Sequence, residues 1–197
     1  MENNPQSISR KVIIVGSSGV GKTSLINRYL GHKFENKLYP TVSPSYLLKS
    51  IAIDEKHRVD LNIWDTAGQE QYQDIGKAFY HGSDIGVVCF DSNPLNMEAV
   101  PKWVDRIRQQ VQDCCIFLAA TKYDIISQDQ DSVYKINSFS KEKVNELNLA
   151  GFYATSAKDN IGIDDLFDEI ARIELTNKEK NEKIDIDSEN ENNKCNC

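Results

Sequence analysis

Residues 16–23 read Gly-Ser-Ser-Gly-Val-Gly-Lys-Thr and directly follow four consecutive apolar residues, Val12 to Val15. Such an apolar run is typical of a strand buried on both faces of a parallel sheet, and residues 22–30 carry apolar side chains at helical spacing. A G-x-x-x-x-G-K-S/T loop in this setting binds phosphate, because backbone N–H groups and the helix N-terminus point at the anion. The pattern predicts that Lys22 contacts the β- and γ-phosphates of a nucleotide and that Thr23 coordinates Mg²⁺. An ordinary glycine-rich turn with an exposed lysine is the alternative, and the register of strand, loop and helix disfavours it.

The composition excludes several broad classes of protein. With 197 residues, of which 40% are hydrophobic and 27% charged, the chain is long enough for one folded domain with a full core. No stretch approaches the roughly 20 apolar residues of a membrane-spanning helix. Residues 1–9 are polar where a signal peptide needs an apolar segment, so we expect a flexible N-terminus and a cytosolic protein. A net charge of −7 disfavours nucleic acid as a partner and electrostatic binding to anionic lipid.

The two ends of the chain differ from its middle. Residues 10–175 contain the apolar patterns of a folded domain, in which Cys89, Cys114 and Cys115 are expected to be small core residues. Residues 176–197 carry four Lys against six Asp or Glu and almost no apolar surface. We therefore expect a disordered tail, since such a segment cannot offset the entropy of ordering.

Strand-like and helix-like patterns alternate through the middle of the chain. Strands are expected at residues 46–53, 57–65, 85–90, 114–120 and 152–155, and helices at 22–30, about 101–111, 138–149 and 163–173. Residues 32–44 are predicted to be a surface loop, residues 125–137 a long loop, and Ser138 or Ser140 a helix cap. The prediction is an α/β fold of the P-loop NTPase class, with a mostly parallel six-stranded sheet, one antiparallel hairpin strand and helices on both faces.

A second motif, Asp65-Thr66-Ala67-Gly68-Gln69, follows the second strand of the hairpin. A carboxylate at a strand end suits the coordination sphere of Mg²⁺, and a nearby glycine lets backbone approach a phosphate. Here the sequence resembles the Ras superfamily of small GTPases. The resemblance implies that Asp65 holds Mg²⁺ through water, that the Gly68 amide contacts the γ-phosphate, and that Gln69 orients the attacking water. If the resemblance is set aside, the alternative is that Asp65 is a capping carboxylate at the strand end and Gln69 a solvated loop residue.

Two further motifs resemble the base-binding segments of that superfamily. In Thr121-Lys122-Tyr123-Asp124, the aspartate can accept from guanine N1–H and from the exocyclic amine, which adenine cannot match, while the Lys122 stem covers the base. Thr121 departs from the more common asparagine, and we expect at most a modest loss of affinity from it. Ser156-Ala157-Lys158 resembles the fifth motif, with the Ala157 amide near the guanine oxygen.

The polar loop between the first helix and the hairpin supplies the remaining contacts implied by the resemblance. Phe34 matches an aromatic residue that packs against the base, and Thr41 matches the switch I threonine that binds Mg²⁺ and the γ-phosphate in the GTP state. Either could instead be an ordinary loop residue. The predicted nucleotide contacts are Ser18, Gly19, Val20, Gly21, Lys22, Thr23, Ser24, Phe34, Thr41, Gly68, Lys122, Asp124, Ser156, Ala157 and Lys158. The predicted metal ligands are Thr23, Thr41 and Asp65, and the predicted catalytic residues are Gln69 and Lys22.

Within the superfamily the chain is most similar to the Rab branch. The shared features are Ser18, the segment Glu70-Gln71-Tyr72, residues 79–84, and the terminal Cys195-Asn196-Cys197. This C-x-C ending resembles the doubly geranylgeranylated tail of Rab proteins, and two lipids can hold a chain that lacks a basic patch. Two accidental terminal cysteines are the alternative. Residues 42–44 read Val-Ser-Pro, which departs from the Rab pattern and predicts altered partners.

The resemblance implies a slow GTPase that binds GTP or GDP with Mg²⁺ and acts as a membrane-anchored switch in vesicle trafficking. Its implied partners are an exchange factor, a GTPase-activating protein, a GDP-dissociation inhibitor and effectors, all binding at switch I (about 33–46) and switch II (about 67–80). The expected location is the cytoplasmic face of an intracellular membrane, with a cytosolic pool. Two alternatives stay open, namely a GTP-binding scaffold that does not cycle and a signalling GTPase of the Rho or Ras type.

Overall fold

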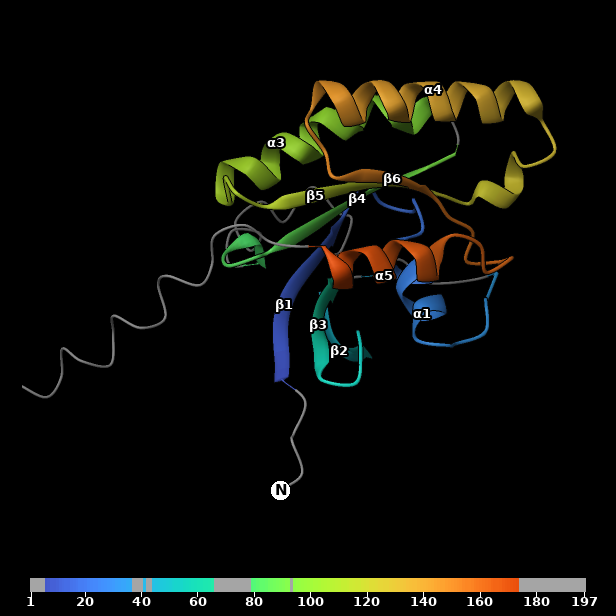
Figure 1. The fold of residues 1–197 in the computed structure, drawn as a ribbon. Helices are drawn as coiled ribbons and strands as arrows, with labels where there is room; N and C mark the ends of the chain where they lie inside the picture. The colour runs from blue at the N-terminus through green and yellow to red at the C-terminus, as the bar shows by residue number, and fades with distance from the viewer. Residues whose placement is uncertain (1–5, 37–40, 42–43, 66–78, 93, 174–197) are drawn as a thin grey trace, which may run out of the picture.

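The sheet of this protein has six strands in the order β2-β3-β1-β4-β5-β6 (Figure 1). The computed structural model describes residues 6–36, 41, 44–65, 79–92 and 94–173. The strands are β1 (Gln6–Val15), β2 (Ser45–Ala52), β3 (His57–Asp65), β4 (Ile85–Asp91), β5 (Cys115–Thr121) and β6 (Gly151–Ala154). β2 runs antiparallel to β3, and every other pair is parallel, which confirms the predicted sheet.

Helices cover both faces of this sheet. They are α1 (Lys22–Tyr29), α3 (Val100–Gln110), α4 (Gln130–Glu146) and α5 (Ile163–Arg172), with short 3-10 helices at Pro94–Ala99 and Tyr123–Ile125. α1 and α5 lie on one face, and α3 and α4 on the other (Figure 1). None of the helices in the described ranges is both long and apolar enough to span a bilayer.

The apolar run of β1 supplies two separate cores. Val12 and Ile14 pack on the side of α1 and α5, whereas Ile13 and Val15 pack on the side of α3 and α4. Successive side chains of a strand point to opposite faces, so a strand covered on both sides needs apolar residues at every position. The carboxyl end of β1 is therefore buried between the two cores. This burial fixes the position of the loop that follows it, residues 16–21.

The prediction of a flexible N-terminus is wrong for residues 6–9, which form the first part of β1. The strand starts at Gln6, opposite His57, because β3 extends far enough to pair with it. Polar contacts hold this part of the sheet, including Ser7 Oγ donating to Asp60 Oδ2 at 2.5 Å and Asn62 Nδ2 donating to Ser9 Oγ at 2.7 Å. An apolar pattern cannot reveal a strand extension whose side chains are polar. Residues 1–5 lie outside the described residues.

The predicted boundaries of the helix before β6 are also wrong. α4 begins at Gln130 rather than at residue 138, and Asp129 is its N-cap, accepting from the backbone N–H of Asp131. Ser140 is not a cap but lies fully buried inside the helix. Residues 130–137 contribute only Val133 and Ile136 to the core, which is too few apolar residues for a recognisable helical pattern. Pro101, in contrast, occupies the first turn of α3 as expected.

Candidate functional site

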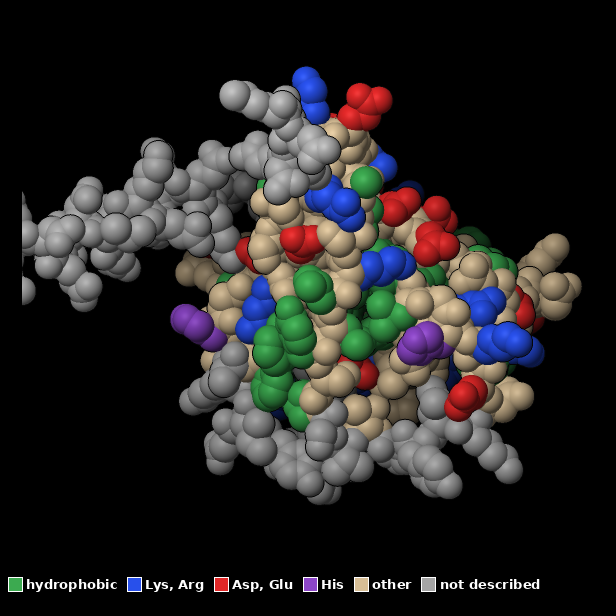
Figure 2. Space-filling model, turned by 90° about the horizontal axis from the view of Figure 1, so that it is seen from below, with side chains coloured by type: hydrophobic (Ala, Val, Ile, Leu, Met, Phe, Trp, Pro, Cys, Tyr) green, Lys and Arg blue, Asp and Glu red, His purple; other side chains and the backbone are tan. Residues whose placement is uncertain are grey.

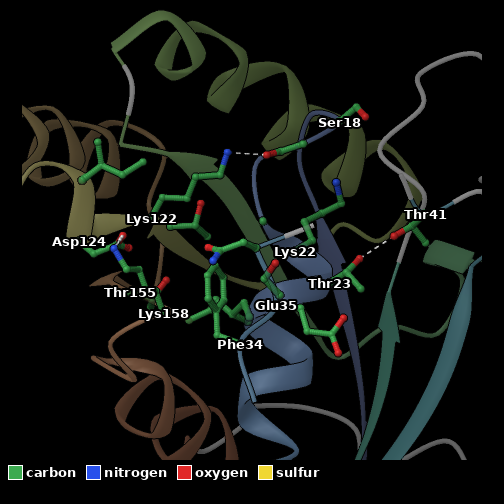
Figure 3. A pocket seen from close by; sticks show the side chains of 18 residues that line it. Ser18, Lys22, Thr23, Phe34, Glu35, Thr41, Lys122, Asp124, Thr155 and Lys158 are labelled. Carbon is green, nitrogen blue, oxygen red and sulfur yellow. Dashed lines mark hydrogen bonds and ion pairs between the residues drawn. The ribbon is translucent and has the colours of Figure 1, made fainter. Parts of the chain in front are cut away.

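A cavity of about 520 Å³ opens at the carboxyl ends of the parallel strands (Figure 3). Twelve of the predicted nucleotide contacts line it, namely Ser18, Gly19, Gly21, Lys22, Thr23, Ser24, Phe34, Thr41, Lys122, Asp124, Ala157 and Lys158. The loop after β1, the start of α1, the segment after β5 and the loop after β6 thus meet at one place. Ligands of open α/β sheets bind at this edge.

Lys22 is held inside the phosphate loop. Its side chain is only 5% exposed, and its Nζ donates to the carbonyl oxygens of Gly16 at 2.8 Å and Ser17 at 2.9 Å. Burial lowers the pKa of Lys22 from its usual value, since a desolvated ammonium is costly. An anion in the loop would relieve this cost, so the position favours a negatively charged ligand.

Three side chains bring oxygen atoms together beside this lysine. Thr23 Oγ1 donates to Asp65 Oδ2 at 2.7 Å, and it lies 2.6 Å from Thr41 Oγ1. Because the one hydroxyl proton of Thr23 goes to the carboxylate, Thr41 must donate to Thr23. The contact joins the first turn of α1 to the loop that was predicted to be switch I.

The same three residues fit a hard divalent cation. Asp65 Oδ1 is buried and has no hydrogen-bond partner among the described residues, which is costly unless a cation or water satisfies it. Burial raises the pKa of Asp65, while the bond from Thr23 and the charge of Lys22 lower it. No group of three or more His, Cys, Asp or Glu that could hold a metal occurs in the described part of the chain. Mg²⁺ needs no such group, because it is usually bound by one or two carboxylates together with hydroxyl, water and phosphate oxygens.

The other end of the cavity presents the carboxylate of Asp124. Ser156 Oγ donates to Asp124 Oδ1 at 2.7 Å, and Lys158 Nζ lies 3.8 Å from Oδ2 (Figure 3). Lys122 adopts a left-handed backbone conformation with φ of 56°, and its Nζ donates to the carbonyl oxygen of Gly19 at 2.7 Å. The Lys122 side chain therefore reaches from the segment after β5 to the phosphate loop.

Thr121, which departs from the family pattern, makes a structural contact of its own. Its buried hydroxyl lies within hydrogen-bond distance of two carbonyl oxygens, that of Phe90 at 3.0 Å and that of Val20. The residue thus ties β4 and β5 to the phosphate loop. The effect of Thr121 on nucleotide affinity stays a prediction.

Some predicted residues lie elsewhere. Val20 is buried in the core, and Ser156 is buried and donates to Asp124. Neither residue lines the cavity itself, but Ser156 holds a residue that does. Gly68, Gln69 and the two terminal cysteines lie outside the described residues. The lining also includes residues that were not among the predicted contacts, namely Leu25, Glu35, Asn36, Thr121, Ile125 and Thr155. Thr121 belongs to a recognised motif, and each of the others lies within two residues of a predicted contact.

An aromatic cluster lies on the outer side of the hairpin. The ring of Trp64 packs against Tyr46 and Phe79, with centroids 5.2 and 5.5 Å apart, and Lys11 Nζ lies 5.0 Å from the Trp64 ring. Tyr46 is 51% exposed. Seen from below, the molecule shows hydrophobic side chains gathered beside Lys and Arg side chains (Figure 2). The cluster connects the ends of the two segments predicted to be switches I and II.

Comparisons with known proteins agree with this geometry. A family model described as "Ras family" matches residues 11–176. The Ypt/Rab-type GTPase YPT7 of Saccharomyces cerevisiae is 33% identical over 199 residues, covering 95% of this chain and 96% of the relative. Rab-7a of Dictyostelium discoideum is 37% identical, covering 82% and 80%, and RABG3b of Arabidopsis thaliana is 38% identical, covering 85% and 84%. The match to this family model over most of the chain, together with the similarity to these relatives, shows that the chain is a Rab-like GTPase of the Ras family.

Proposed function

We propose that this GTPase is a Mg²⁺-dependent switch that acts in vesicle trafficking at the cytoplasmic face of an intracellular membrane. The observation that supports the switch is the set of contacts among Thr23, Thr41 and Asp65. These oxygens connect the phosphate loop and α1 to the predicted switch I. Loss of the terminal phosphate of the bound nucleotide therefore changes the contacts available to Thr41. Partners bind the conformation that results.

The chain contributes mainly position and charge to hydrolysis. Lys22 neutralises charge on the β- and γ-phosphates, and the backbone of the phosphate loop fixes their orientation. Thr23 and Thr41, together with Asp65 through water, would hold Mg²⁺, and the bound cation would add to the neutralisation of the phosphate charge. Gln69 orients the water that attacks the γ-phosphorus, so that GTP and water give GDP and phosphate. Arg28 points away from this chemistry, donating to Asn160 Oδ1 at 3.0 Å. The intrinsic rate is accordingly slow, and an activator's arginine accelerates it by about 10³- to 10⁵-fold.

Replacing Gln69 with leucine tests this mechanism. We expect single-turnover hydrolysis of bound GTP to slow by about tenfold or more, because the attacking water loses its orientation. Affinity for GDP should change little, since the γ-phosphate is absent from that ligand. Gln109, exposed on α3, gives the matched control Gln109→Leu, which should hydrolyse GTP at the wild-type rate. Unchanged intrinsic and activator-stimulated rates in Gln69→Leu would remove Gln69 from the mechanism.

The aromatic cluster of Tyr46, Trp64 and Phe79 is the surface that we assign to regulators and effectors. It adjoins both switch segments and combines an exposed aromatic residue with a nearby lysine, as binding surfaces often do. The exchange factor, the activator, the GDP-dissociation inhibitor and the effectors would contact this surface and the adjoining switches.

The proposed anchor is a pair of prenyl groups on Cys195 and Cys197. A single lipid chain gives marginal, reversible membrane binding, and the tail has no basic patch to add to it. We expect Cys195→Ser and Cys197→Ser each to shift most of the protein from membrane to soluble fractions, and the double variant to shift essentially all of it. Intact mass spectrometry of protein from its native cells measures the lipids directly, and a mass without them would contradict the anchor. Cys115→Ser is the control, and it should fractionate as the wild type does.

A further inference from the structure

The carboxyl end of β4 lies beside the segment predicted to surround the base. Thr121 Oγ1 lies 3.0 Å from the carbonyl oxygen of Phe90, and Ser92 Oγ donates to the carbonyl oxygen of Thr121 at 2.8 Å. Asp91, between Phe90 and Ser92, pairs in register with Thr121 and is only 9% exposed. A buried carboxylate is costly unless it is paired, so Asp91 indicates a cation close by.

The cation beside Asp91 is Lys122, which lines the nucleotide cavity. Lys122 Nζ lies 3.3 Å from Asp91 Oδ2, and the same nitrogen donates to the carbonyl oxygen of Gly19 at 2.7 Å. Figure 3 shows the Lys122 side chain directed toward the loop that carries Ser18. The ammonium group thus has one acceptor in the phosphate loop and a second, charged acceptor at the end of β4.

The charged acceptor is needed because water competes for this ammonium group. The side chain of Lys122 is 38% exposed, and a long, flexible stem loses rotamer freedom when it is held in one conformation. The carbonyl oxygen of Gly19 is neutral, whereas Asp91 adds the attraction of opposite charges, little weakened by solvent since its side chain is 13% exposed. Asp91 therefore keeps Lys122 extended toward Gly19.

Asp91 itself is not among the described residues that line the cavity. An effect of its carboxylate on a ligand is therefore expected to pass through Lys122. The stem of Lys122 is predicted to cover the base, and its ammonium group ends on the phosphate loop. The direction of this one side chain thus matters at both ends of a nucleotide.

We propose that Asp91 is a positioning residue for the guanine nucleotide, because it holds Lys122 in the conformation that covers the base and contacts the phosphate loop. The inference rests on the proposed function, in which the cavity holds a guanine nucleotide. Without the carboxylate, Lys122 turns toward solvent, and bound GDP leaves faster. Without Lys122, the negative charge of Asp91 beside the phosphate loop is no longer offset by that lysine, and its removal no longer weakens binding.

Release of a fluorescent GDP analogue from the full chain in saturating Mg²⁺ tests this role. We expect Asp91→Asn, which keeps the size of the side chain but removes its charge, to release the analogue roughly three- to thirtyfold faster. Asp91→Ala removes the acceptor as well and should release it at least as fast. Asp105→Asn, a change of an exposed carboxylate on α3, is the control and should release it at the wild-type rate.

A double-mutant cycle with Lys122→Met separates positioning from a simple loss of stability. Lys122→Met alone should also accelerate release. Adding Asp91→Asn to it should leave the rate unchanged or lower it, because no ammonium group remains to be positioned. A general destabilisation would act in both backgrounds, and urea unfolding of each variant measures it.

Three results would overturn the proposal. They are an unchanged rate in Asp91→Asn, an unchanged rate in Lys122→Met, and an equal acceleration by Asp91→Asn with and without Lys122. Failure of the proposed function would look different, since release from the wild type would then be insensitive to removal of Mg²⁺ by a chelator.

Discussion

Replacing Lys22 with methionine should weaken binding of both GDP and GTP by about 10²- to 10⁴-fold. Hydrogen bonds to charged groups contribute about 1.5–3 kcal/mol each, and Lys22 is placed to make two of them to phosphate oxygens. Isothermal titration of nucleotide-free protein in the presence of Mg²⁺ measures the loss. Lys135→Met, on the exposed face of α4, is the matched control and should bind both nucleotides normally.

The same substitution should not destabilise the nucleotide-free fold by a comparable amount. Lys22 is buried and its pKa is lowered by that burial, so its charge costs free energy when no anion is bound. A methionine of similar length removes this cost together with the bonds to Gly16 and Ser17. We therefore expect the urea midpoint of the empty protein to stay the same or rise. A collapse of stability that matches the loss of affinity would mean that Lys22 is a structural residue.

Replacing Asp124 with asparagine should change which base the protein binds. Guanine presents two adjacent N–H donors, and a carboxylate accepts both, whereas an amide offers one acceptor and one donor. We expect affinity for GDP to fall by about 10²-fold or more, because one donor of the base then faces another donor. Xanthine carries an oxygen in place of the exocyclic amine, so the variant should bind XDP more tightly than the wild type does.

Competition between GDP and XDP for a fluorescent nucleotide measures this exchange of specificity. Asp113→Asn, in the exposed turn between α3 and β5, is the control and should keep the wild-type preference for GDP. Equal losses for GDP and XDP in Asp124→Asn would indicate a damaged pocket rather than altered base recognition, and would contradict the role assigned to Asp124.

The sequence predicted the sheet and most of the cavity because both depend on local patterns. Apolar runs identified β1, β4 and β5, and the motifs after these strands had to converge where parallel strands end. The predicted boundaries were wrong where an element begins with residues that do not show an apolar pattern. The first half of β1 is held by polar contacts such as Ser7 with Asp60, and the first two turns of α4 place only Val133 and Ile136 against the core.

Contacts between distant residues could not be predicted from one sequence. Lys49 Nζ donates to the carbonyl oxygen of Tyr29, 20 positions earlier, and neither residue belongs to a recognised motif. The hydroxyl of Thr121 reaches Val20 across 101 positions, and only the structure shows that threonine keeps a link to the phosphate loop. Such contacts depend on how β2, α1 and β5 pack, which local propensity does not specify.

Lys122 has a consequence for selectivity among nucleotides. Its side chain belongs to the segment that surrounds the base, yet its ammonium group ends on the carbonyl oxygen of Gly19, in the loop for the phosphates. The side chain of Lys122 therefore links the part of the cavity predicted to hold the base to the part predicted to hold the phosphates. We expect a nucleotide with the wrong base to bind more weakly for two reasons. Its edge does not match Asp124, and any displacement of Lys122 by the base also removes the hydrogen bond from Lys122 to the carbonyl oxygen of Gly19.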